Sequence, residues 1–172
     1  MTTIIRPARI DDAAWVAVLA ERTFRETYTA YNTPDDMERY VAEHFGPAHQ
    51  TAELGDARLV TLVAEVDARL AGYTQLARGP APNGVNAVTP MEVVRFYVDR
   101  PWHGSGLAHE LMAAAVDAAR NGGADALWLG VWERNPRAIA FYRKCGFQNA
   151  GTQTFVLGTD HQRDLVLARP LA

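Results

Sequence analysis

The sequence RFYVDRPWHGSGLAHELM, residues 95–112, runs from an apolar strand-like segment through a Pro-Trp-His loop into Gly-Ser-Gly and then a helix. Glycines hold positions 104 and 106, and no Asp, Asn or Thr stands beside them to cap the helix. The first four N–H groups of a helix lack partners within the helix and carry partial positive charge. Glycines let a ligand approach the backbone closely, so this junction predicts an anion-binding site at a strand-loop-helix turn.

Hydrophobic periodicity predicts a mixed α/β fold around this junction. Apolar residues at helical spacing, with favourable caps, predict helices over residues 11–28, 33–45, 107–121 and 135–147. Short apolar runs bounded by turn residues predict strands over residues 2–9, 58–66, 69–77, 91–98, 126–132, 149–158 and 162–171. A loop rich in Gly, Pro and Asn covers residues 78–90. Strands interleaved with helices in this order favour one mixed sheet with helices on its faces.

Composition narrows the possible functions. A chain of 172 residues is expected to form a single domain over residues 1–172. The formal net charge is −3 and no run of Lys or Arg exceeds two residues, which argues against nucleic acid or a membrane surface as the main partner. The single cysteine, Cys145, excludes an internal disulfide, and the five histidines show no metal-ligand spacing, so no metal is expected. Without a signal-like N-terminus or a long apolar run, a soluble cytoplasmic protein is expected.

Two familiar phosphate-binding motifs do not match the junction. A P-loop needs Gly-Lys-Ser/Thr, and the sequence contains none. A dinucleotide-binding fingerprint would begin at Gly104 and Gly106, but His109 stands where its last glycine belongs. The loop that follows Val98 is also long for the tight turn of that fingerprint.

The segment His103–Ala108, HGSGLA, resembles the acyl-CoA-binding motif of the GCN5-related N-acetyltransferase (GNAT) family, Gln/Arg-x-x-Gly-x-Gly/Ala. This chain departs from the pattern at its first position, where His103 stands in place of Gln or Arg. About thirty residues downstream, NPRAIAFYRKCGF is similar to the family's signature Asn-x-x-Ala-x-x-Phe-Tyr-x-x-x-Gly-Phe. The segments IIRPARIDDAAWVAVL and FVLGTDHQRDLVLARPL resemble the family's usual start and its last hairpin. The resemblance therefore extends over nearly the whole chain.

This resemblance implies a fold and an activity. The fold would be α/β, a mixed, mostly antiparallel, splayed sheet of six to seven strands flanked by about four helices. The activity would be transfer of an acyl group, most simply acetyl, from acetyl-CoA as cosubstrate to a primary amine by direct attack in a ternary complex. The alternative is a domain that binds acyl-CoA as a sensor without catalysing transfer.

The resemblance also implies positions for the cosubstrate. Backbone amides of the loop would surround the diphosphate of coenzyme A, the open strand before the loop would pair with the pantetheine arm, and the downstream signature would contact that arm. The implied cofactor-binding residues are Phe96, Tyr97, Val98, His103, Gly104, Ser105, Gly106, Leu107, Ala108, Asn135 and Tyr142. Asn135 is also in position to cap the helix that follows it.

Acyl transfer to an amine requires a proton acceptor and a proton donor. An alkyl ammonium with a pKa near 10.4 is neutral in only about one molecule in a thousand at pH 7. Glu92 is the candidate base, because two-residue alternation places it on one strand face with Val94, Phe96 and Val98. The alternative is a strand-start residue paired with an arginine. Tyr142 is the candidate donor to the departing thiolate, and the alternative is a core aromatic residue.

The acceptor is the least determined feature of the sequence. By resemblance, its site lies between the first two helices and the loop before residue 91, with Phe24, Glu26, Tyr28 and Tyr31 as candidates to line it. All four are also compatible with helix packing or with solvent-facing positions. Candidate acceptors are small amines including polyamines, amino acids, an antibiotic, or an amine of a peptide or protein. The strand segment QTFVLG, residues 153–158, is a candidate homodimer surface.

Overall fold

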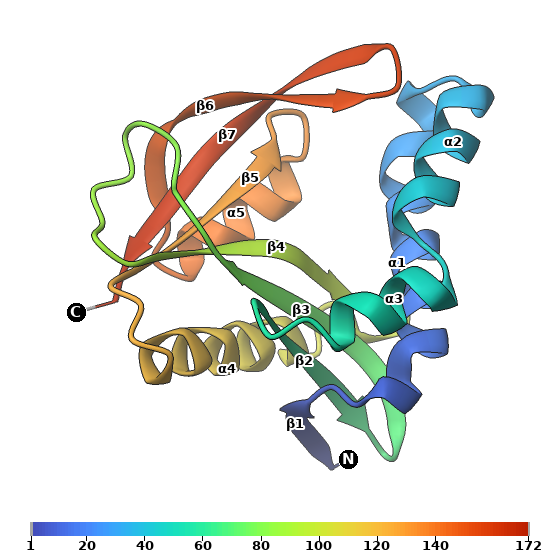
Figure 1. Ribbon diagram of the computed structural model, residues 1–172, viewed down its shortest axis with the longest axis horizontal. Helices are drawn as coiled ribbons and strands as arrows, with labels where there is room; N and C mark the ends of the chain where they lie inside the picture. The colour runs from blue at the N-terminus through green and yellow to red at the C-terminus, as the bar shows by residue number, and fades with distance from the viewer. Residues whose placement is uncertain (1, 172) are drawn as a thin grey trace.

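The computed structural model describes residues 2–171, which form a seven-stranded sheet and five α-helices (Figure 1). The strands are β1 (Thr3–Pro7), β2 (Leu59–Val66), β3 (Arg69–Arg78), β4 (Pro90–Val98), β5 (Ala126–Trp132), β6 (Gln148–Leu157) and β7 (Asp160–Pro170). The helices are α1 (Ala13–Tyr28), α2 (Pro34–His44), α3 (Pro47–Leu54), α4 (Leu107–Asn121) and α5 (Pro136–Lys144). The expected mixed α/β fold is confirmed.

The sheet has the strand order β1-β2-β3-β4-β5-β7-β6, and only the β4–β5 pair is parallel. These two strands pair at three positions, from Pro90 with Ala126 to Glu92 with Trp128. Both strands continue beyond these pairs, β4 to Val98 and β5 to Trp132, without further pairing to each other. The sheet therefore splits between β4 and β5, as the splayed sheet implied by the resemblance requires.

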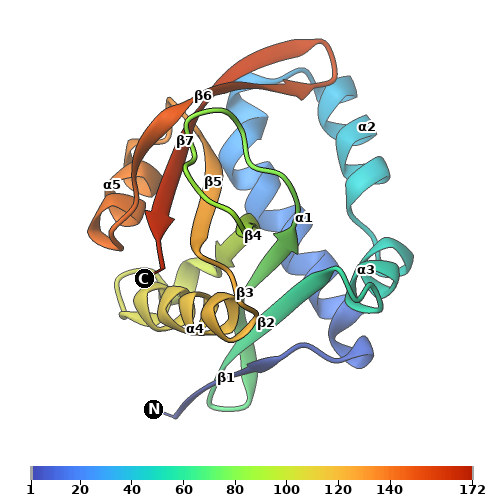
Figure 2. The same cartoon turned by 60° about the vertical axis from the view of Figure 1, so that its left-hand side comes forward.

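Helices cover both faces of the sheet, α4 and α5 on one and α1 to α3 on the other (Figure 2). On the α4 face, Leu111 and Met112 of α4 pack in two clusters of buried apolar side chains, which also contain Leu62 of β2 and Leu127 of β5. On the opposite face, α1 and α2 pack on β2 and β3 through a cluster that contains Leu19. These cores hold the two halves of the split sheet in place.

The predicted elements are present in the predicted order, and one helix was missed. Helix α3 spans eight residues, PAHQTAEL, and buries only Gln50. A helix without an apolar face has no hydrophobic period to detect. It begins at Pro47 after Gly46, whose φ of 145° no side-chain-bearing residue adopts easily. Among residues 2–171 no helix is long and apolar enough to cross a membrane.

A β-bulge in β4 overturns the predicted alternation. Leu76 of β3 pairs with Val93, whereas the preceding residue Gln75 pairs with Arg95, so Val94 is an extra residue without a partner on β3. One extra residue reverses which face every later side chain occupies. Phe96 therefore packs on the α4 side with Val93, and Glu92 faces the side of α1 to α3. The prediction that Glu92, Val94, Phe96 and Val98 share a face is wrong.

Candidate active site

A cavity of about 1530 Å³ occupies the split between β4 and β5. At one end it is lined by the loop before α4 and by the first turns of α5, and at the other by aromatic side chains of α1 and α2. Glu92 and Tyr142 both line it. The cavity thus connects the predicted anion site, the two candidate catalytic residues and the predicted acceptor region.

The two glycines of the loop have left-handed backbone conformations. Gly104 has φ 80° and Gly106 has φ 95°, and Gly106 is the N-cap of α4 without any side-chain cap. A Cβ built on either glycine would meet no protein atom within 4 Å. The chain therefore needs glycine here for the backbone conformation, and the space beside both residues is open to a ligand.

The loop leaves alternate backbone amides free. The amides of His103 and Ser105 donate to carbonyl groups of the preceding turn at 3.1 and 3.3 Å, and the amide of Leu107 donates to the Ser105 hydroxyl at 3.3 Å. Within residues 2–171 the amides of Gly104, Gly106 and Ala108 have no such acceptor. These three lie at the electropositive N-terminus of α4, where an anion is favoured. Of the six loop residues predicted to bind the cosubstrate, these three leave their amides free to donate, whereas the Leu107 side chain is buried in the core.

His103 stands at the first motif position and is fixed by two contacts. Its Nε2 lies 2.8 Å from the Val98 carbonyl oxygen, which can only accept, so Nε2 carries a proton and donates. Arg137 Nη1 lies 3.2 Å from His103 Nδ1, and Arg137 Nη2 lies 3.4 Å from His103 Nε2. The contacts with Val98 and Arg137 tie α5 to the loop and bring the Arg137 charge beside the free amides.

Tyr142 projects from α5 into an aromatic environment. Its ring packs edge-on against Phe96 at 6.2 Å and against Phe147 at 5.9 Å between centroids. Burial raises the pKa of the Tyr142 hydroxyl, so the group is protonated and able to donate at neutral pH. Asn135 caps α5 as expected, because its side chain accepts a hydrogen bond from the Ala138 amide at 3.1 Å.

Glu92 lies at the closed end of the split and lines the cavity. Burial raises the pKa of its carboxyl group, and no charged or hydrogen-bonding neighbour contributes to the shift. The alternative that Glu92 pairs with an arginine is not supported among the described residues. The arginine on the same strand face, Arg95, is bound instead by Glu53 of α3.

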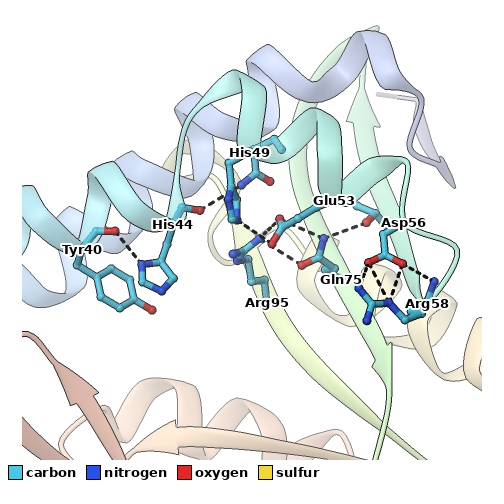
Figure 3. A network of polar contacts seen from close by, with 10 residues as sticks. Tyr40, His44, His49, Glu53, Asp56, Arg58, Gln75 and Arg95 are labelled. Carbon is cyan, nitrogen blue, oxygen red and sulfur yellow. Dashed lines mark hydrogen bonds and ion pairs between the residues drawn. The ribbon is translucent and has the colours of Figure 1, made fainter.

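Figure 3 shows the polar network that holds Arg95. Glu53 also contacts His49 at 3.1 Å and accepts from Gln75 Nε2 at 3.4 Å. The Arg95 guanidinium lies 5.5 Å from the centre of the Phe45 ring. The charge of Arg95 is therefore neutralised by Glu53, and the ion pair joins α3 to β4 at one wall of the cavity.

The predicted acceptor residues all line the cavity, in different ways. Phe24 is buried in the α1–α2 core and stacks on Tyr40 at 4.6 Å between centroids. Tyr28 packs against Trp132 at 5.6 Å, and Tyr31 meets the same indole edge-on at 4.7 Å while 57% exposed. Glu26 is exposed at the rim. Phe24 thus has the helix-packing role that the sequence allowed as its alternative. Tyr28 and Tyr31 present ring surface to the cavity.

Several cavity residues escaped sequence reasoning: Tyr40, Trp132, Gln153, Phe155 and Asp164. Asp164 is the most informative, because it is buried in the middle of the last strand. Asp164 directly precedes the apolar residues LVLA, and a charged residue at this place in a strand segment is the one signal that the sequence offers. The other four are aromatic or amide side chains of kinds that also occur in cores, and no local pattern separates them.

The fold and the site define a protein with a split sheet and a loop of free amides at a helix N-terminus, where an anion is favoured. The model of the acetyltransferase (GNAT) family matches residues 19–147, and the chain belongs to this family. It is an N-acetyltransferase, the activity for which its curated relatives are named.

The chain resembles these relatives over almost its full length. It is 35% identical to an uncharacterized N-acetyltransferase of Mycobacterium tuberculosis over 93% of this chain and 98% of the relative. A second uncharacterized N-acetyltransferase, from Lactobacillus delbrueckii subsp. lactis, is 29% identical over 98% of this chain and 96% of the relative's chain. Among solved structures, PaiA N-acetyltransferase from Thermoplasma acidophilum in complex with coenzyme A superposes with a TM-score of 0.80 at 20% identity, covering 99% of each chain. This last similarity shows the fold alone.

Proposed function

We propose that the protein transfers an acetyl group from acetyl-CoA to a primary amine by direct attack within a ternary complex. The observation that carries the proposal is that one cavity joins three free amides at the start of α4 to the half-buried Glu92 and Tyr142. The complexes of PaiA with coenzyme A and of YncA from Salmonella typhimurium with acetyl-CoA support the choice of cosubstrate.

The residues present fit such a cosubstrate. Gly104, Gly106 and Ala108 would donate their amides to the diphosphate, with Arg137 adding positive charge beside them. The unpaired edge of β4 beyond Glu92, which carries Phe96, would offer backbone groups to the amide-bearing pantetheine arm. When bound, acetyl-CoA supplies an activated carbonyl carbon and a thiolate leaving group.

Glu92 acts as the base in this proposal. An amine at neutral pH is almost entirely ammonium, and it must lose a proton before its nitrogen can bond to the carbonyl carbon. The carboxylate of Glu92, acting directly or through a water molecule, accepts that proton. Burial without a cationic partner makes the carboxylate more basic than an exposed glutamate, which favours this transfer.

Tyr142 acts at the other end of the reaction. As the nitrogen–carbon bond forms, the carbon–sulfur bond breaks and the sulfur takes both electrons of that bond. The protonated hydroxyl of Tyr142 donates a hydrogen bond or its proton to this sulfur. The products are an amide and free coenzyme A.

The proposal is tested by measuring free thiol released from acetyl-CoA across a library of amines and peptides, together with mass spectrometry of the acceptor. We expect thiol release that depends on an amine and matches formation of the acetylated product. Calorimetric binding of coenzyme A without thiol release from any acceptor would instead identify an acyl-CoA-binding domain. Absence of both binding and release would remove the proposal.

A further inference from the structure

Asp164 is a buried carboxylate without a partner. It is 8% exposed, and its Oδ1 has no hydrogen-bond partner within residues 2–171. Its Oδ2 lies 3.1 Å from the position that a Cβ on Gly130 would take, so the carboxylate rests over the glycine of β5. A buried charge is costly unless it is paired, and no side chain in the described part of the chain, residues 2–171, pairs this one.

The charged and titratable neighbours of Asp164 do not include a cation that could neutralise it. Burial, and secondarily the negative charge of Glu133, raise the pKa of Asp164 to about 6. The nearby arginine on β7, Arg163, is directed to Glu133 at 3.6 Å. The facing groups on α1 and α2 are the hydroxyls of Tyr28 and Tyr40. Both are neutral at pH 7, because the ordinary pKa of a phenol is about 10 and burial raises it further here. In its ionised form Asp164 therefore has no cationic partner among residues 2–171, and a ligand in the cavity can supply one.

Aromatic rings form the walls beside this carboxylate. Tyr28 lies between Trp132 at 5.6 Å and Phe155 at 6.4 Å, measured between ring centroids. Tyr31 covers the outer side of Trp132. Such a surface accommodates methylene groups and also attracts a cation through the ring faces. A ligand that fits this end of the cavity carries a positive charge on an apolar stem.

Glu92 and Asp164 line the same cavity from opposite sides of β5. The reacting ammonium group loses one proton and therefore needs only one base, which in the proposed function is Glu92 at the point where β4 and β5 separate. Asp164 is not needed for that proton transfer, and its negative charge is suited to binding a second positive charge on the acceptor. Resting on the proposed function, we propose that Asp164 and the aromatic wall of Tyr28, Trp132 and Phe155 bind a non-reacting ammonium group of the acceptor. The preferred acceptors are then alkyl diamines or longer polyamines.

The test compares straight-chain alkyl diamines with monoamines of the same carbon number in the thiol-release assay. For the wild-type protein we expect a lower KM for the diamine. Asp164→Asn should raise the KM for the diamine by roughly tenfold or more, the loss of a charge-assisted contact, with little change in kcat and little effect on the monoamine. Asp164→Glu, which keeps the charge, should restore part of the preference. Glu133→Gln is the control for long-range attraction, because it removes a neighbouring charge outside the cavity and should preserve the preference.

A second readout does not depend on acetyl transfer. Calorimetry of the diamine with each variant reports binding directly, and melting temperatures show that the variants fold. Diamine binding by the wild-type protein that is lost in Asp164→Asn supports the subsite even if no thiol is released, in which case the proposed function fails alone. An equal fall of kcat for diamine and monoamine would make Asp164 a group acting on the reacting amine and would overturn this inference. Unchanged diamine preference and binding in Asp164→Asn would overturn it too.

Discussion

Glu92 and Trp128 form the last register pair between the parallel strands β4 and β5. Beyond this pair the strands separate, and the cavity that they enclose reaches both the free amides of α4 and the aromatic rings of α1. The carboxylate of Glu92 thus lies where the split begins, on the sheet face turned toward α1 rather than α4.

Replacing Glu92 with Gln removes the proposed base while keeping the shape of the side chain. We expect turnover near pH 7 to fall by about a hundredfold, within the range of general-base contributions, and to recover partly at high pH as the free amine becomes abundant. In the wild-type protein, activity should fall as pH drops through the raised pKa of Glu92, because protonation removes the base. Rates measured from pH-dependent thiol release check both expectations. Glu43→Gln, at an exposed position on α2, is the control; a pH profile for Glu92→Gln equal to that of the wild type would exclude Glu92 from the mechanism.

Replacing Tyr142 with Phe removes only the hydroxyl group. Because the ring contacts with Phe96 and Phe147 remain, the fold and the affinity for coenzyme A should change little. Turnover should fall by roughly tenfold to a hundredfold, the loss of one hydrogen bond to a developing charge. Thiol release and calorimetry with coenzyme A separate the two effects. Full activity in this variant would return Tyr142 to a packing role.

Replacing Gly106 with Leu should abolish coenzyme A binding. A side chain there enters the open space beside the free amides and disfavours the left-handed backbone, at a cost of about 1–2 kcal/mol. Gly123, at the other end of α4, has φ 80° and the same open surroundings. Gly123→Leu therefore carries the same strain and should bind coenzyme A normally in calorimetry. Equal binding by the two variants would show that the loop is not the cosubstrate site.

Replacing Asp164 with Asn should change how stability depends on pH. The folded-state pKa of about 6 exceeds the ordinary value of 3.8, so ionisation of Asp164 destabilises the fold. This cost is absent below the ordinary value, grows as pH rises toward about 6, and is constant above. The unfolding free energy of Asp164→Asn relative to the wild type should therefore increase across that window in denaturant titrations. A difference that decreases with pH would reveal a stabilising partner of the carboxylate.

Replacing Gly130 with Ala tests the space beneath Asp164. A Cβ there would lie 2.5 Å from Gln153 Nε2 and 3.1 Å from Asp164 Oδ2, so both side-chain ends must move away. We expect a higher KM for the amine with unchanged affinity for coenzyme A, measured by thiol release and calorimetry. Gly79→Ala, where a Cβ meets no atom, is the control. An unaltered KM would mean that this part of the cavity does not contact the acceptor.

Local sequence patterns predicted most of the fold. The hairpin between β2 and β3 turns at Asp67 and Ala68, both with positive φ, which are the two residues left between the strands predicted over 58–66 and 69–77. Asn135 and Thr33 cap the helices that follow them, because capping depends on residues only three positions apart. Helix α3 was missed because it is short and buries almost no apolar side chain.

Sequence patterns predicted the candidate site only in the part that is formed by residues close together in the chain. The loop from His103 to Ala108 and the helix after it are neighbours in sequence, so the free amides follow from glycines that permit a left-handed backbone. By contrast, the face that Glu92 occupies depends on the bulge at Val94, which exists only through pairing with β3. Asp164 becomes an unpaired carboxylate only when β7 lies beside β5 and α1 closes over it. Sequence by itself determined the order of elements and the glycine loop before α4. Tertiary structure decided which distant side chains share the cavity, because burial and pairing arise from contacts between segments far apart in the chain.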